Sequence, residues 1–134
     1  MRIGVPKEIK IHESRVGLTP TAVRELVARG HQVMVQKNAG IRIDLDDGKY
    51  QSAGAEIVEM AQEIYAKADL IVKVKEPQPN EIPLLRQGQV LFTYLHLAPD
   101  PVQTQGLMDS GCIAIAYETV TDSFGGLAAA GADE

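Results

Sequence analysis

Short apolar runs alternate with helix-like segments along this chain, and that alternation restricts the possible fold more than any other feature. Six runs favour strands, and they occupy residues 2–6, 32–36, 55–58, 69–74, 90–95 and 112–117. Some are apolar without alternation, as in Val90-Leu91-Phe92, which is typical of strands covered on both faces. We therefore predict an α/β fold with an open, mostly parallel, doubly wound sheet and helices on both faces.

Helix boundary signals lie between these runs. Thr19 followed by Pro20 suits an N-cap and a first helical position, and Gly30 suits the left-handed residue after the helix. Further helices are predicted through Tyr50, from Met60 to Ala68, after an N-cap at Asn80, and from Asp100-Pro101 to Gly111. The strand–helix alternation therefore continues over most of the chain.

Composition excludes several classes of protein. The 134 residues suffice for one domain, and the formal charge of −5 is spread over interspersed acidic and basic residues, without the basic patch expected for nucleic acid. No apolar run approaches the roughly 18 residues that cross a membrane, and no signal peptide is recognisable. Cys112 is the single cysteine, which fits a cytoplasmic protein, and its spacing from the histidines predicts no metal site.

Polar side chains are predicted to gather at one edge of the sheet. Lys75 follows the run at 69–74, Tyr94 and His96 end the run at 90–95, and Glu118 follows the last run. Arg15 lies in the loop that leaves the first strand. Because the carboxyl ends of parallel strands share one edge, where ligands bind in open α/β sheets, these side chains are candidates for a common site.

The chemistry of these side chains suits a small anionic substrate. Arg15 can bind a carboxylate through two hydrogen bonds, Lys75 can polarise a carbonyl group, and His96 can move a proton near neutral pH. Simpler structural roles fit the same spacing. Arg15 could pair with the acidic residue two positions before it, Lys75 with the glutamate that follows it, His96 with a neighbouring backbone group, and Glu118 could cap a turn.

Four motifs resemble one enzyme family. They are MRIGVPKEIKIHESRVGLTP at residues 1–20, DLIVKVKEP at 69–77, VLFTYLHLA at 90–98 and AIAYETV at 114–120. They are similar to segments of alanine dehydrogenases and of the related subunit of nicotinamide nucleotide transhydrogenases. Lys75 and His96, which the transhydrogenase branch does not keep, make the chain resemble alanine dehydrogenase more closely.

The resemblance implies a function for residues 1–127, as part of the N-terminal, substrate-binding catalytic domain of an enzyme that converts L-alanine, NAD and water into pyruvate, ammonia and NADH. It assigns the substrate carboxylate to Arg15, the carboxylate and carbonyl to Lys75, and acid/base catalysis to His96. Tyr94 and Glu118 would line the substrate site. The complete enzyme would be a cytoplasmic homo-oligomer, a hexamer in the family.

The chain also departs from the family pattern. Residues 128–134 form an atypical tail, no Gly-x-Gly-x-x-Gly occurs, and Arg42 and Asp44 stand where the family has more glycines. We expect the nucleotide-binding domain, and with it most of the NAD site, to be absent from this chain, which would be inactive alone. The alternatives are a non-enzymatic module that binds a small acid or a partner protein, and a transhydrogenase subunit domain.

Overall fold

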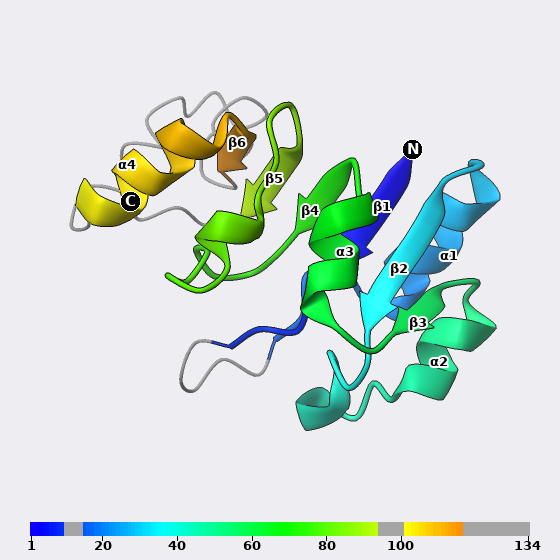
Figure 1. The fold of residues 1–134 in the computed structure, drawn as a ribbon. Helices are drawn as coiled ribbons and strands as arrows, with labels where there is room; N and C mark the ends of the chain where they lie inside the picture. Colours follow the sequence, from blue (N-terminus) through cyan, green and yellow to red (C-terminus); the bar gives the residue numbers. More distant parts are fainter. Residues whose placement is uncertain (10–14, 94–100, 117–134) are drawn as a thin grey trace, which may run out of the picture.

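The computed structural model describes residues 1–9, 15–93 and 101–116. The strands are β1 (Arg2–Val5), β2 (Gln32–Gln36), β3 (Glu56–Val58), β4 (Leu70–Val72), β5 (Val90–Thr93) and β6 (Ile113–Ala116). The helices are α1 (Pro20–Ala28), α2 (Asp47–Ser52), α3 (Ala61–Lys67) and α4 (Pro101–Ser110), with 3-10 turns η1 (Ile41–Ile43) and η2 (Ile82–Leu84) (Figure 1). No helix in these ranges is long and apolar enough to cross a membrane.

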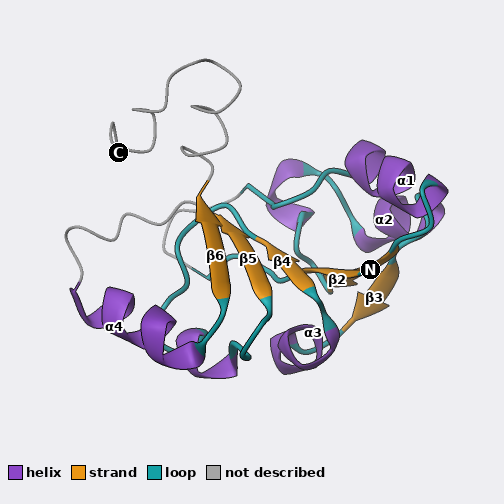
Figure 2. Cartoon of the chain, turned by 90° about the horizontal axis from the view of Figure 1, so that it is seen from above, coloured by secondary structure: helices purple, strands orange, loops and turns teal. Residues whose placement is uncertain are grey.

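The strands form one sheet in the order β3-β2-β1-β4-β5-β6, and every neighbouring pair is parallel. Helices α1 and α2 cover one face of this sheet, and α3 and α4 cover the other (Figure 2). The predicted doubly wound sheet with helices on both faces is therefore confirmed. The order 3-2-1-4-5-6 is that of dinucleotide-binding α/β sheets, although here it occurs without their glycine fingerprint.

Apolar side chains pack on both faces of the sheet. Val5 and Val35 are fully buried on the face that α1 and α2 cover, where Val23 packs among them. Ile71 and Leu91 are fully buried on the opposite face, in a second cluster that includes residues of α3. This two-sided burial explains why the central strands carry apolar side chains at successive positions.

The predicted start and end of α1 are confirmed. Thr19 is the N-cap, its hydroxyl accepts a hydrogen bond from the Ala22 amide at 3.3 Å, and Pro20 occupies the first helical position. Gly30 follows the helix with a φ of 93°, a conformation that glycine adopts without steric cost. These local signals act within a few residues, so the sequence pattern suffices to place them.

The prediction that Asn80 caps a helix is wrong. The residue before η2 is Glu81, which is buried, whereas Asn80 is exposed. The Glu81 carboxylate accepts a hydrogen bond from the Gln78 amide at 2.8 Å. Its longer side chain therefore organises this turn from inside the protein, which a local capping signal does not reveal.

Strand β4 is shorter than the predicted run at 69–74, because it ends at Val72. The Lys73 amide makes one more bond toward β5, to the Phe92 carbonyl oxygen at 3.0 Å. Beyond it, the amides of Val74 and Lys75 donate to a side chain instead of to a strand. Lys75 therefore lies in the loop after β4 and does not end the strand itself.

Candidate functional site

The sheet has a switch point between β1 and β4. The chain leaves β1 toward β2 on one side, and β4 lies on the other side with Ile3 opposite Leu70 and Gly4 opposite Ile71. In such sheets the two segments that leave the carboxyl ends diverge and form a crevice where ligands bind. The segments at this point are residues 6–9 and 73–78, and they carry several charged side chains.

Glu8 occupies the loop after β1, and its carboxylate is directed at the loop after β4. Its exposed fraction is only 8%. One oxygen accepts from the Lys73 ammonium at 3.0 Å and from the Lys75 amide at 3.2 Å. The other accepts from the Val74 amide at 2.9 Å. Glu8 therefore joins the two loops of the switch point through three hydrogen bonds.

Lys73 is buried between two carboxylates. Its exposed fraction is 1%, and its ammonium lies 3.3 Å from Glu81 as well as 3.0 Å from Glu8. The Tyr65 hydroxyl donates to Glu81 at 3.2 Å. Burial, and then the adjacent Glu81 carboxylate, raise the pKa of Tyr65 far above its ordinary value, so the hydroxyl remains a donor. The donors around both carboxylates compensate for their removal from water.

Lys75 is half-buried and is held through both of its backbone polar groups. Its amide donates to Glu8 at 3.2 Å, and its carbonyl oxygen accepts from the Thr93 hydroxyl at 2.7 Å. Thr93 is the last residue of β5 and is fully buried. Side chains from the loop after β1 and from the end of β5 therefore fix the backbone of the predicted site lysine.

The segment that carries Arg15 lies against the end of β4. A methyl group added at Gly17 would lie 2.8 Å from the carbonyl carbon of Val72 and closer still to its oxygen. Only glycine permits this approach of two backbones. Arg15, two residues before Gly17, is exposed. The structure thus brings the Arg15 segment to the strand that precedes Lys75.

Three of the predicted site residues, Tyr94, His96 and Glu118, lie outside the described residues. Their convergence with Arg15 and Lys75 remains a prediction. Sequence reasoning missed Glu8 and Glu81, and it treated Lys73 only as part of an apolar run. A signal was present, because Lys73 lies within a run expected to be covered on both faces, and a lysine is almost never fully buried unless it is paired.

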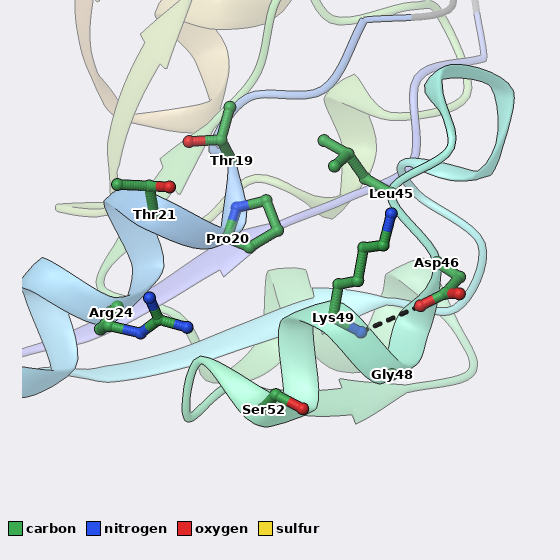
Figure 3. Close-up of a pocket in the computed structure, with 9 residues that line it drawn as sticks. All are labelled: Thr19, Pro20, Thr21, Arg24, Leu45, Asp46, Gly48, Lys49 and Ser52. Carbon is green, nitrogen blue, oxygen red and sulfur yellow. Dashed lines mark hydrogen bonds between the residues drawn. The ribbon is translucent and has the colours of Figure 1, made fainter.

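The structure also contains a pocket of about 610 Å³ that includes none of the predicted site residues. It lies between the first turns of α1 and α2, with Thr19 and Arg24 on one side and Asp46 and Lys49 on the other (Figure 3). The Lys49 ammonium is engaged by the Asp44 carbonyl oxygen at 2.7 Å. Among the described side chains, no group of three His, Cys, Asp or Glu residues could hold a metal ion.

Known proteins are similar to this chain over most of its length. Residues 4–131 match the family described as "Alanine dehydrogenase/PNT, N-terminal domain". An alanine dehydrogenase of Halomonas elongata is 53% identical over 127 residues, which are 95% of this chain and 34% of that protein. The Bacillus subtilis alanine dehydrogenase is 50% identical over 122 residues, 91% of this chain and 32% of that protein.

Two known structures share the fold. An L-alanine dehydrogenase has a TM-score of 0.87 at 51% identity, over 90% of this chain and 33% of that one. A transhydrogenase from Sinorhizobium meliloti has a TM-score of 0.82 at 26% identity, over 88% of this chain and 35% of that one. The chain thus spans about a third of the length of these relatives. It belongs to the family of alanine dehydrogenase/PNT N-terminal domains.

Proposed function

We propose that this chain is the substrate-binding N-terminal domain of an NAD-dependent alanine dehydrogenase, which interconverts L-alanine and pyruvate. The observation that carries the proposal is the packing of the Arg15 segment against the end of β4, with Lys75 held in the loop that follows. This packing supports the placement of two cationic residues, distant in sequence, at one edge of the sheet. This arrangement supports binding of a small carboxylate at the switch point.

The proposed roles follow from the chemistry of the substrate. The Arg15 guanidinium would bind the carboxylate of pyruvate or alanine through two parallel hydrogen bonds. The Lys75 ammonium would hydrogen-bond the keto oxygen and draw electron density from the carbonyl carbon. His96 would act as the acid or base for water and ammonia at that carbon. Tyr94 and Glu118 would complete the walls of the site.

The residues after β1 do not fit NAD. In dinucleotide-binding sheets of this strand order, a glycine-rich turn after the first strand approaches the pyrophosphate closely. Here that turn contains Pro6, which has no amide hydrogen, and Glu8, whose buried carboxylate would repel phosphate. We propose that another part of a longer protein binds most of the cofactor, and we assign no step of the reaction to NAD in this chain.

A fusion enzyme tests the proposal. The matched segment of the Halomonas elongata alanine dehydrogenase would be replaced by the corresponding residues of this chain, and NADH formation from L-alanine would be followed. H96A should lower turnover about 100-fold, as is usual for loss of an acid/base group. R15K should chiefly raise KM for alanine, because lysine cannot reproduce the two-pronged contact.

R24K provides the matched control, since Arg24 is exposed on α1 and lies outside the proposed site. It should leave both KM and turnover unchanged. A fusion enzyme that folds, as judged by circular dichroism, yet forms no NADH from alanine would overturn the proposal. By the family resemblance we also propose that the longer protein is a cytoplasmic homo-oligomer, which sedimentation of the fusion enzyme would examine.

A further inference from the structure

We propose that Glu8 and Thr93 are positioning residues for Lys75. Glu8 accepts a hydrogen bond from the Lys75 amide and Thr93 donates one to the Lys75 carbonyl oxygen, so the backbone that carries the Lys75 side chain is fixed at the switch point of the sheet. The inference rests on the proposed function, in which the Lys75 ammonium contacts the substrate. It adds two residues that hold this lysine without touching the substrate themselves.

The sheet cannot hold Lys75, because its hydrogen bonds end too early. Strand β4 stops at Val72, and the last bond toward β5 joins the Lys73 amide to the Phe92 carbonyl oxygen at 3.0 Å. The backbone from Val74 onward therefore needs other partners, since buried amides and carbonyl groups are costly to leave unpaired. Side chains from the loop after β1 and from the last residue of β5 supply these partners.

Glu8 supplies the acceptor for the amide hydrogens. Its two oxygens accept from Val74 and Lys75 at 2.9 and 3.2 Å, so both peptide planes are set by one carboxylate. The carboxylate is itself held by the Lys73 ammonium at 3.0 Å. Lys73 thus holds the Glu8 carboxylate in place, and Glu8 in turn orients the backbone of Lys75.

Thr93 supplies the donor for the carbonyl oxygen. Its hydroxyl lies 2.7 Å from the Lys75 oxygen, and its side chain has no exposed surface. Valine has nearly the same shape but no hydroxyl, whereas serine keeps the hydroxyl. The Thr93 bond can therefore be removed or retained by substitutions that change the packing little, which makes it the better site for a test.

The position of the Lys75 backbone matters because the lysine would act through the position of its ammonium group. A displacement of about 1 Å from the reactive geometry can cost on the order of 100-fold in rate. Loss of the Thr93 hydrogen bond would leave the Lys75 carbonyl group without this donor, so the position of the Lys75 backbone, and of the side chain it carries, would be less well fixed. The reaction should therefore be impaired even where the fold survives.

The test compares T93V, T93S and K75A in the fusion enzyme, with pyruvate reduction in the presence of ammonia and NADH as the assay. T93V should lower kcat/KM for pyruvate about tenfold or more and shift its pH profile, because the ammonium is displaced. T93S should restore both to nearly the values of the parent enzyme. T21V, at an exposed threonine on α1, should change neither.

The outcomes separate the inference from the proposed function. If K75A abolishes activity while T93V keeps the kcat/KM and pH profile of the parent, the inference is wrong and the proposed function stands. If the parent fusion folds but is inactive, both are wrong. If K75A is fully active, Lys75 has no role in the reaction and the inference is wrong, whereas the fusion remains an alanine dehydrogenase. Should T93V fail to fold, E8Q takes its place, because glutamine has one acceptor oxygen where the Glu8 carboxylate has two. An unaltered kcat/KM in E8Q would also overturn the inference.

Discussion

Lys73 shows how a charge can be accommodated inside this sheet. Removing an ammonium group from water costs several kcal/mol unless opposite charges compensate for it. Here Glu8 and Glu81 lie 3.0 and 3.3 Å from it, and the three side chains are almost inaccessible to solvent. The two ion pairs therefore depend on one another, because the ammonium of Lys73 offsets the repulsion between the two buried carboxylates.

Replacement of Lys73 by methionine should be strongly destabilising. K73M keeps the volume of the side chain but leaves two buried carboxylates without their cation, and we expect a loss of about 3–5 kcal/mol in the free energy of unfolding. Urea denaturation followed by circular dichroism measures it. The control is K67M, at an exposed lysine that pairs with Glu63 at 2.9 Å, where the loss should be below about 1 kcal/mol. Equal losses in both variants would contradict this account.

Tyr50 predicts how stability responds to alkaline pH. Its hydroxyl donates to the Leu18 carbonyl oxygen at 2.7 Å, and burial raises the pKa of Tyr50 to about 12 from an ordinary 10.0. Because the folded state holds this proton more tightly than the unfolded state, its contribution is complete below pH 10 and declines as pH rises toward 12. Stability should therefore fall in that interval.

Y50F isolates this contribution. Phenylalanine cannot ionise, so the stability of Y50F should decline less than that of the parent between pH 10 and 12. At neutral pH the variant should lose about 1 kcal/mol, because the hydrogen bond to the Leu18 carbonyl is gone. Urea denaturation at a series of pH values gives both numbers. Parallel stability curves for the two proteins would show that Tyr50 does not titrate as described.

Gly17 controls how the loop after β1 packs against β4. The group that an added methyl would meet is the Val72 carbonyl, and backbone of a central strand cannot move aside as a flexible side chain does. G17A should lower the free energy of unfolding by about 1–3 kcal/mol, the usual cost of overpacking. In the fusion enzyme it should also raise KM for alanine, because the Arg15 segment is displaced.

Gly48 offers the matched control for this substitution. It lies within α2, and the nearest atom to an added methyl is an oxygen of Asp46 at 3.4 Å. Alanine favours a helix over glycine by about 1 kcal/mol, so G48A should be neutral or stabilising in the same urea experiment. A destabilisation of G48A equal to that of G17A would show that backbone proximity to β4 is not the cause.

Elements were predictable where the signal lies within the element itself. The apolar run of β2 and the Thr19-Pro20 start of α1 depend on neighbours in sequence, and both are confirmed. The end of β4 depends on Glu8, which draws the next amides out of the strand pattern. The start of η2 depends on Glu81, whose partners include a tyrosine 16 residues away. Such boundaries follow from tertiary contacts, and periodicity does not contain them.

Only part of the candidate site could be predicted from the sequence. A parallel sheet places strand ends together, so Lys75 was expected at the carboxyl edge from its position after an apolar run. The pairing of Glu8 with Lys73 spans 65 residues, and many other acidic residues were possible partners. The order of the strands decides which acidic residue lies next to Lys73. The alternation of strands and helices in the sequence does not specify that order.

NAD binding should distinguish this chain from the longer relatives. We expect that the isolated 134 residues do not bind NAD tightly, because the turn after β1 carries Pro6 and Glu8 where a pyrophosphate needs glycine amides. Calorimetric titration of NAD into the chain measures this, with the Halomonas elongata protein titrated alongside. A Kd in the micromolar range for the isolated chain would disprove the expectation.

The central place of β1 has a consequence for the chain as it is synthesised. Ile3 pairs with Val33 on one side and with Leu70 on the other, partners that follow it by 30 and 67 positions (33 − 3 and 70 − 3). At about 5–20 residues per second, the ribosome needs roughly 3–13 s to reach the second partner. Until then one apolar edge of the nascent β1–β2 pair is unpaired, so we expect this interval to be the step at which the growing chain depends most on chaperones.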